Sequence, residues 1–268
     1  MSFTEHNVNG LIYDTSDVIT AAGSGAVHAF TTRHGGVSPA PYDSLNFADN
    51  KGDTSENLLE NYRRLGEAVG FDASRAVGCR QIHASKVSEE DAGKILWDDR
   101  PYDADGLITN VPNLPLFAYG TDCCVITLYD PTSRSIGAVH AGWRGTASGI
   151  ALKAAVSMMS CYGADPYTLR AAISPSIGKC CFETDSDVAD AFFALLDPAM
   201  DERIEKRGDK YHIDLKAINA LWLRKSGVTQ IDVSGDCTAC RTDLYWSHRK
   251  HGGERGSQIA MISLEDTL

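Results

Sequence analysis

Clusters of positive charge are missing from this sequence. Its 25 Lys and Arg residues are outnumbered by 36 Asp and Glu residues, the formal net charge is −11, and no run of Lys and Arg occurs. A nucleic-acid backbone attracts clustered basic side chains, so we expect no nucleic-acid partner. Long apolar runs are missing as well: none approaches the ~18 residues of a membrane span, and the first residues carry no signal-peptide pattern. We expect a cytoplasmic protein that does not contact a membrane.

Internal divisions are also lacking. No repeat, low-complexity tract or linker interrupts the 268 residues, so the sequence predicts a single domain over residues 1–268. With 43% hydrophobic residues, the chain can bury a sizeable core. No amphipathic or apolar segment is left over for a partner subunit, so we expect a monomer. The eight cysteines of a large cytoplasmic chain are more typical of buried thiols, metal ligands or catalytic groups than of disulfides.

The spacing of apolar residues predicts both helices and strands. A helix is expected from Asp53, which can cap it, to about Val69, with Gly70 ending it. Three short apolar runs separated by turns predict strands at 116–119, 125–129 and 136–139. The other predicted elements are helices at 146–160, 186–196 and 215–226 and strands at 169–173, 231–233 and 259–262. This mixture predicts an α/β (α+β) fold: a single layered domain with a mixed β-sheet and flanking helices.

Two chemically useful side chains stand at one end of a predicted hairpin. Cys123 lies at the start of the second predicted strand, and His140 ends the third. The turn between these strands contains Asp130-Pro131, which is typical of a tight connection. The start of the first strand and the end of the second meet at the same end of a hairpin. We therefore expect Cys123 and His140 to be neighbours in space, as metal ligands or as a catalytic pair.

The segment after His140 has features of a ligand-binding loop. Glycines at positions 137, 142 and 145 allow close approach to the backbone. Trp143 offers a stacking surface, and Arg144 offers a fixed positive charge immediately before the helix predicted from residue 146. Helix N-termini attract anions, so this segment predicts a site for a phosphate or a carboxylate.

A series of short motifs in fixed order carries a resemblance to a known family. The motifs are Thr31-Thr-Arg33-x-Gly-Gly-Val-Ser, Ser44-Leu-Asn46, Gln81-Ile-His83, Asp105-Gly-Leu-Ile-Thr, Thr121-Asp-Cys123, His140-Ala-Gly-Trp-Arg-Gly145, Cys180-Cys-Phe-Glu183, Cys237-Thr238 and Ser247-His-Arg249 with Gly252-Gly253. From about residue 28 onward the chain resembles the laccase-domain or polyphenol oxidase family, whose members are now described as purine nucleoside phosphorylases with adenosine deaminase activity. Ser257 departs from this pattern, because an Arg after Gly is usual there.

The resemblance implies a metal site and a substrate class. In that family a His of Gln-x-His, the Cys of Asp-Cys and the His of His-Ala-Gly-Trp-Arg-Gly bind one metal, which here correspond to His83, Cys123 and His140. It also implies that adenosine, inosine or methylthioadenosine is cleaved with phosphate, and that adenosine is deaminated. Phosphorolysis requires that the charge of phosphate be neutralised. Arg33 and Arg144 are our candidates for that role.

Two His and one Cys leave a tetrahedral zinc ion one ligand short, the pattern of catalytic zinc. The same three ligands also occur in copper sites, so Cu²⁺ and a copper-dependent polyphenol oxidase stay as an alternative. However, a multicopper laccase needs many histidines, typically in His-x-His pairs, and this chain has eight His and no such pair. A further alternative is a hydrolase (amidase) that edits peptidoglycan precursors, with Cys123 as the nucleophile and His140 as the base.

Cys237 and Cys240 have the spacing of a zinc or redox pair. No second pair with regular spacing accompanies them. A structural site completed by Cys180 and Cys181 is one alternative, and ordinary thiols without a ligand are the other.

Overall fold

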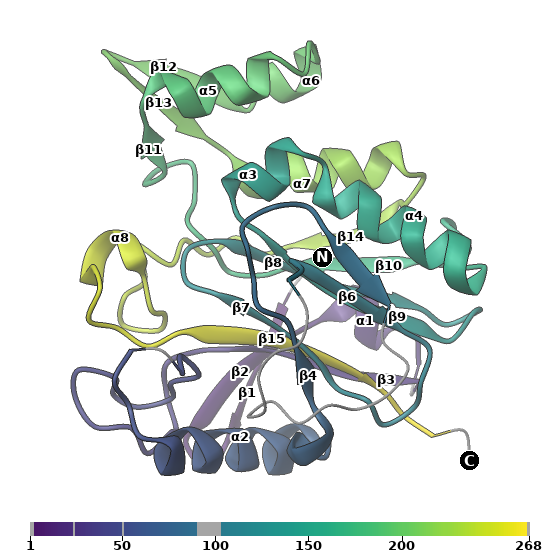
Figure 1. The fold of residues 1–268 in the computed structure, drawn as a ribbon, viewed down its shortest axis with the longest axis vertical. Coiled ribbons are helices and arrows are strands. Elements are labelled where there is room, and N and C mark those ends of the chain that lie inside the picture. The colour runs from purple at the N-terminus through teal and green to yellow at the C-terminus, as the bar shows by residue number, and fades with distance from the viewer. Residues whose placement is uncertain (1–2, 24, 50, 90–102, 267–268) are drawn as a thin grey trace.

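Two six-stranded sheets stack against each other in the computed structural model, which describes residues 3–23, 25–49, 51–89 and 103–266 (Figure 1). The first sheet has the order β1 (Phe3–Val8), β2 (Leu11–Ser16), β3 (Ala26–Thr31), β15 (Gln258–Leu264), β7 (Leu116–Gly120) and β4 (Val77–Gly78). The second has the order β14 (Gln230–Val233), β10 (Arg170–Ile173), β8 (Cys124–Asp130), β9 (Ser135–Ala141), β6 (Gly106–Thr109) and β5 (Val87–Glu89). Both are mixed, because β4–β7, β10–β14 and β5–β6 are parallel pairs and the other pairs are antiparallel.

Helices lie on the outer faces of these sheets, between them and beside them. They are α1 (Asp17–Thr20), α2 (Ser55–Val69), α3 (Trp143–Ala147), α4 (Ile150–Tyr162), α5 (Ser186–Phe193), α6 (Pro198–Asp201), α7 (Leu215–Lys225) and α8 (His248–His251), with a 3-10 turn at Ala73–Arg75. A small third sheet, of β11 (Glu183–Thr184), β13 (Lys210–Ile213) and β12 (Ile204–Arg207), extends beyond α3 together with α5 and α6 (Figure 1).

Alternation along the strands produces three stacked layers of core. On β8, Val125 belongs to the apolar cluster between the two sheets, whereas Ile126 belongs to the cluster under α4 and α7. On β15, Ala260 faces the second sheet and Met261 faces α2. Because successive side chains on a strand point to opposite faces, each sheet contributes to two core layers. The result is a four-layer α/β/β/α arrangement.

The predicted fold class is confirmed, with mixed sheets and flanking helices, although there are two large sheets rather than one. The predicted hairpin is β8–β9, with Val125 opposite His140. The strand at 116–119 is β7, but it lies in the first sheet, so the turn after Gly120 crosses between the sheets. Strands β1 and β2 are not predicted from the sequence, because they mix polar with apolar side chains.

Two helix boundaries differ from the prediction for identifiable reasons. The cap of α2 is Thr54 rather than Asp53, since the Thr54 side chain accepts a hydrogen bond from the backbone N–H of Asn57. The helix predicted at 146–160 is divided into α3 and α4 at Gly149, whose φ of +71° is left-handed. There the Trp222 indole donates to the carbonyl of Thr146 at 2.8 Å, which satisfies a carbonyl near the break.

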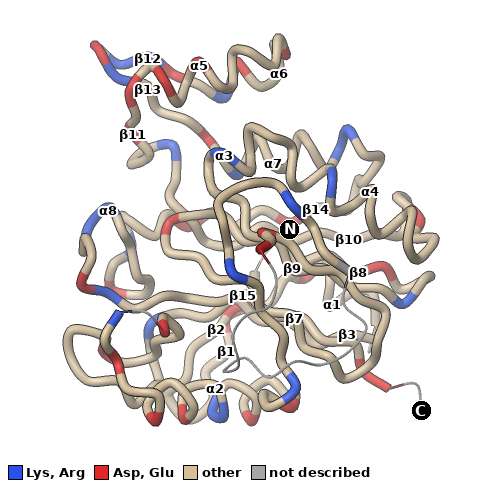
Figure 2. The backbone as a smooth tube through the Cα atoms, in the orientation of Figure 1, with Lys and Arg blue, Asp and Glu red and all other residues tan. Residues whose placement is uncertain are grey.

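Charges of both signs are interspersed along the backbone (Figure 2). On α2, for example, Arg63 and Arg64 both pair with Glu60. Such mixing differs from the continuous basic face that nucleic-acid binding requires. In the described part of the chain, no helix is both long and apolar enough to cross a membrane.

Candidate active site

The β8–β9 hairpin brings two of the predicted site residues, Cys123 and His140, close together. Val125 pairs with His140 and Cys124 pairs with Ala141, so Cys123, which immediately precedes β8, lies beside the end of β9. His140 is buried, and Cys123 is half-buried. Cys124, as expected from alternation, points the other way into the core under α4.

His83 reaches the same place from the loop after β4. Its ring lies 4.8 Å from that of His140, centroid to centroid, in an edge-to-face arrangement. The residue has a φ of +55°, a left-handed conformation that few residues other than Gly adopt, although His, Asn and Asp do so more often than most. The loop is held on the first sheet by Gln81, whose amide donates to the carbonyl of Tyr119 at 2.9 Å and accepts from its N–H at 2.7 Å.

Asp105 organises both histidines from a fully buried position. Its Oδ1 lies 3.0 Å from Nδ1 of His140 and also accepts from the backbone N–H of His83 at 2.9 Å. Its Oδ2 accepts from the N–H of Ala84 at 2.7 Å. Burial raises the pKa of Asp105, but these hydrogen bonds outweigh burial and hold it below its usual value. An ionised Asp105 therefore fixes the His140 ring and leaves Nε2 as its available nitrogen.

The three side chains can hold one metal ion. One ligand atom from each of His83, Cys123 and His140 lies within 4.8 Å of the other two. Burial raises the pKa of the Cys123 thiol, but His140 and His83 outweigh burial and lower it to about 6. Burial lowers the pKa of His140, whereas Cys123 and Asp105 raise it to about 9. A thiolate is thus available near neutral pH, which is the form that binds a metal or attacks a substrate.

Gly142 explains how these side chains fit so closely. A Cβ at this position would lie 3.3 Å from Sγ of Cys123, 3.4 Å from Cε1 of His140 and 3.5 Å from Cδ2 of His83. The backbone after β9 thus passes directly against all three candidate ligands. The glycines around His140 predict such a close approach, and Gly142 provides it.

The candidate ligands open into a cavity of about 310 Å³, a volume in the range of small-molecule sites. Its other lining residues are Phe47, Ala48, Asp49, Lys51, Arg80, Gln81, Tyr119, Thr121, Arg255 and Ser257. Arg255 is half-buried and donates to Oγ1 of Thr121 at 2.9 Å and to the carbonyl of Gly256 at 3.0 Å. Burial lowers its pKa, and Asp122 and Cys123 act in the opposite direction. The guanidinium is thus fixed at the cavity wall close to the candidate ligands.

The two arginines chosen from the sequence do not line this cavity. The guanidinium of Arg33 stacks 3.8 Å from the Trp246 ring centroid and donates to the carbonyls of Asp43 and Thr242. These contacts tie loops together. Arg144 is exposed and lies over its neighbour Trp143, 4.1 Å from the ring centroid. A phosphate role for either residue stays a prediction from the sequence.

Two residues that line or support the site were not assigned to it from the sequence. Asp105 stands in a motif that carries the resemblance, and an Asp directly before a short apolar run is the sequence signal that could have identified it. Arg255 lies two residues before Ser257, the position where the family usually has an Arg. Arg255 lines the cavity because of the path that the chain takes into β15. Local sequence does not predict that path.

Comparison with known proteins places the chain in a family. A family model described as "Multi-copper polyphenol oxidoreductase laccase" matches residues 27–265. The chain belongs to this laccase-like family. Among curated members, the purine nucleoside phosphorylase YlmD of Geobacillus stearothermophilus is 36% identical over 247 residues, covering 89% of this chain and 90% of the relative. A purine nucleoside phosphorylase of Deinococcus radiodurans is 37% identical over 238 residues, covering 88% of each chain.

Solved structures of family members have the same fold. The hypothetical protein YfiH of Bacillus licheniformis superimposes with a TM-score of 0.90 at 29% identity, covering 98% of this chain and 99% of that one. The structure of YlmD from Geobacillus stearothermophilus gives a TM-score of 0.86 at 31% identity, with the same coverage. The family's fold therefore extends over nearly the whole chain.

Proposed function

We propose that this protein is a zinc-dependent purine nucleoside phosphorylase that also deaminates adenosine. The relatives named purine nucleoside phosphorylase support the substrate class. The observation that carries the proposal is the convergence of His83, Cys123 and His140 at one cavity, with Asp105 behind His140. Adenosine, inosine and methylthioadenosine are the proposed nucleosides.

The donor set fits zinc in a catalytic role. Two imidazoles and one thiolate are zinc ligands, and three protein ligands leave a position for water or substrate. A histidine ligand usually donates its other ring nitrogen to a carboxylate, as His140 does to Asp105. When bound, zinc would supply a Lewis acid and a water of lowered pKa, which suits deamination at the purine ring.

The chain's own residues would bind and orient the nucleoside and phosphate. Phosphorolysis transfers the ribosyl group from the base nitrogen to a phosphate oxygen: the C–N bond breaks, a C–O bond forms, and the base leaves with a proton. Arg255 is the cation that we propose for the phosphate, since its guanidinium lines the cavity and is held by Thr121. A charge fixed before the reaction stabilises developing negative charge without reorganisation.

One rival uses the same residues without a metal. Asp105, His140 and Cys123 stand in the order of an orienting acid, a base and a nucleophile, and the lowered pKa of Cys123 suits nucleophilic attack. A Cys/His hydrolase (amidase) is therefore the second candidate. The copper oxidase reading shares the His₂Cys ligands, and the family's description supports it.

Reconstitution separates these three. The protein is stripped with a chelator, reloaded with Zn²⁺ or Cu²⁺, and assayed with adenosine plus phosphate while base and ribose 1-phosphate are quantified. We expect turnover with zinc, loss of turnover in the stripped protein, and loss in His83→Ala and Cys123→Ala but not in Cys161→Ala. Phenol oxidation restored only by copper, or amide hydrolysis that survives chelation with no nucleoside turnover, would overturn the proposal.

A further inference from the structure

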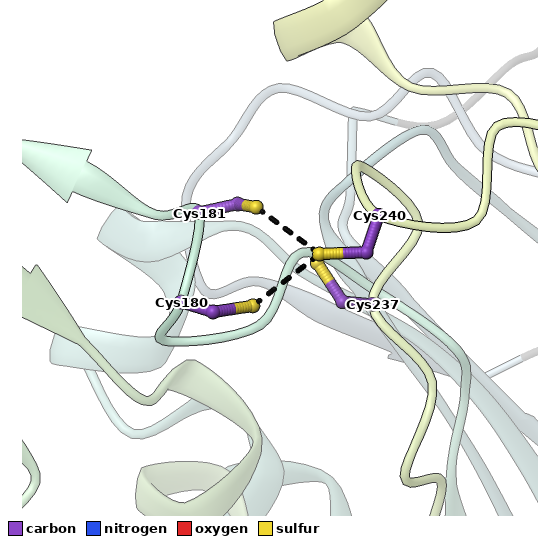
Figure 3. Close-up of side chains that lie close together, drawn as sticks. All are labelled: Cys180, Cys181, Cys237 and Cys240. Atoms are coloured by element: carbon purple, nitrogen blue, oxygen red, sulfur yellow. Dashed lines mark hydrogen bonds between the residues drawn. The ribbon is translucent and has the colours of Figure 1, made fainter.

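Four cysteines outside the cavity form a second cluster, and we propose that they bind one structural zinc ion. They are Cys180 and Cys181, in the loop between β10 and β11, and Cys237 and Cys240, in the loop after β14 (Figure 3). This inference concerns residues other than His83, Cys123 and His140, and it does not depend on the proposed function.

The distances among the four sulfurs match a single tetrahedral ion. All four Sγ atoms lie within 4.8 Å of one another, with 3.7 Å between Cys180 and Cys240 and 3.4 Å between Cys181 and Cys240. Four thiolates at the Zn–S bond length of ~2.3 Å stand about 3.8 Å apart. A disulfide needs about 2.05 Å between its sulfurs, which these separations exceed. An iron–sulfur cluster spaces its outer thiolates farther apart than one ion does, so a single ion fits best.

The backbone builds this cluster from two segments that are far apart in sequence. Strands β10 and β14 are parallel neighbours, so the loops that follow them leave the second sheet at the same edge. A bridge between Ser176 and Cys237 continues the pairing into the loops, and the N–H of Thr238 donates to the carbonyl of Ser176 at 3.1 Å. The two Cys pairs are thereby brought face to face, as Figure 3 shows.

One backbone hydrogen bond already points at a sulfur of the cluster. The N–H of Gly178 donates to Sγ of Cys237 at 3.1 Å, which places a backbone dipole on that sulfur. Zn²⁺ would displace one proton from each of the four thiols, giving a complex of net charge −2. Arg249 lies alongside and donates to the carbonyl of Cys181 at 2.9 Å. Since Cys180 and Cys240 are exposed, an ion can enter from solvent.

The cluster is connected to the candidate active site through Asp122, the residue before Cys123. Asp122 is buried with a φ of +74°. Its Oδ1 accepts from the Thr238 hydroxyl at 2.6 Å, and its carbonyl accepts from the N–H of Ile177 at 2.9 Å. These two partners come from the two loops that carry the cysteines. An ion joining the loops would therefore also hold the turn that presents Cys123.

Metal content measured on variants tests this assignment. Protein purified under reducing conditions without added metal is analysed for zinc and iron by mass spectrometry. We expect Cys240→Ser to hold one zinc ion per chain fewer than the parent protein, and Cys123→Ser to keep the zinc ion at the four cysteines. The control is Cys161→Ser, which alters an exposed cysteine on α4 outside both clusters and should retain the zinc content of the parent protein.

Alkylation of the parent protein provides a readout that does not depend on how the variants fold. With iodoacetamide we expect Cys180, Cys181, Cys237 and Cys240 to react at least 10-fold more slowly than Cys161, and to become reactive after chelation. A single zinc ion that is lost in Cys123→Ser, with the four cysteines reacting as fast as Cys161, would overturn the proposal. So would several iron atoms per chain, or a disulfide between any of the four. Nucleoside turnover is not scored, so failure here is distinct from failure of the proposed function.

Discussion

Oδ1 of Asp105 lies 3.0 Å from Nδ1 of His140, and both side chains are buried. The same carboxylate accepts the backbone N–H groups of His83 and Ala84. One residue thus sets the ring orientation of one candidate ligand and the backbone path of another.

Asp105→Asn should weaken metal binding at His83, Cys123 and His140. Both oxygens of Asp105 accept hydrogen bonds, but an Asn side chain has only one oxygen. Its NH₂ group would therefore face one of these donors and could not accept from it. Loss of such a partner lowers metal affinity by about 10- to 100-fold. Competition with a zinc chelator measures this change. The matched control is Asp130→Asn, another buried carboxylate, at the end of β8; an equal loss of affinity there would show that Asp105 has no specific role.

Arg255→Gln should impair the use of phosphate. Removing one charged hydrogen-bond donor costs about 1.5–3 kcal/mol, so we expect KM for phosphate to rise about 10- to 100-fold while the zinc content stays the same.

Arg33→Lys should instead lower the melting temperature, since lysine cannot reproduce the stacking on Trp246 and the bonds to two loops. Steady-state kinetics and thermal unfolding of both variants decide the matter. A higher KM for phosphate in Arg33→Lys, with no change in Arg255→Gln, would show that Arg33 and not Arg255 binds phosphate.

Gly142→Ala should damage the metal site without changing any charge. The added methyl group would lie 3.3 Å from Sγ of Cys123, closer than most Cβ contacts, and 3.4 Å and 3.5 Å from the rings of His140 and His83. We expect zinc bound at this site to dissociate at least 10-fold faster, which a chromogenic chelator can follow. Gly253→Ala is the control, because a Cβ there meets nothing within 4 Å. Equal zinc dissociation in the two variants would contradict the prediction.

Stability should decline in mild acid because of His28. This residue is buried on β3, and its Nε2 accepts the N–H of Ser16 at 2.7 Å. Burial lowers its pKa from 6.5 to about 4. Between pH 6.5 and pH 4 the unfolded chain binds a proton at His28 that the folded chain does not. The contribution of neutral His28 to the free energy of unfolding is therefore fully present above pH 6.5 and is lost as the pH falls toward 4. The full shift corresponds to about 3 kcal/mol.

Urea unfolding at pH 7.5 and pH 4.5 tests this contribution when the parent protein is compared with His28→Gln. The Gln amide oxygen can accept the same N–H, but it does not titrate. We expect the variant to lose less stability between the two pH values than the parent does. The same loss in both would show that other groups produce the acid sensitivity.

The parts of the site that depend on local pattern could be predicted from the sequence. Cys123 and His140 were expected to be neighbours because two apolar strands flank a tight turn, and register in a hairpin follows from the turn. His83 was placed only by resemblance. Its position depends on Asp105 and on a left-handed backbone, neither of which apolar periodicity encodes.

Long-range pairing accounts for what the sequence did not reveal. Cys237 and Cys240 have a recognisable spacing, but their proximity to Cys180 and Cys181 follows from the parallel neighbours β10 and β14. In the same way, apolar runs predicted β7 and β8 but not their separation into two sheets. Such pairings join residues far apart in the chain, where local propensity carries no information.

The first sheet cannot form completely until β15 has been synthesised. This strand is late in the chain, yet it lies between β3 and β7 in the interior of the first sheet. During synthesis the two halves of that sheet must wait for residues 258–264 before they can join, and Ser257 reaches the cavity only with that strand. Contacts of such long sequence separation form slowly. A ribosome-bound chain that stops before β15 would therefore expose two unpaired strand edges to the cell and have an incomplete cavity at the candidate site.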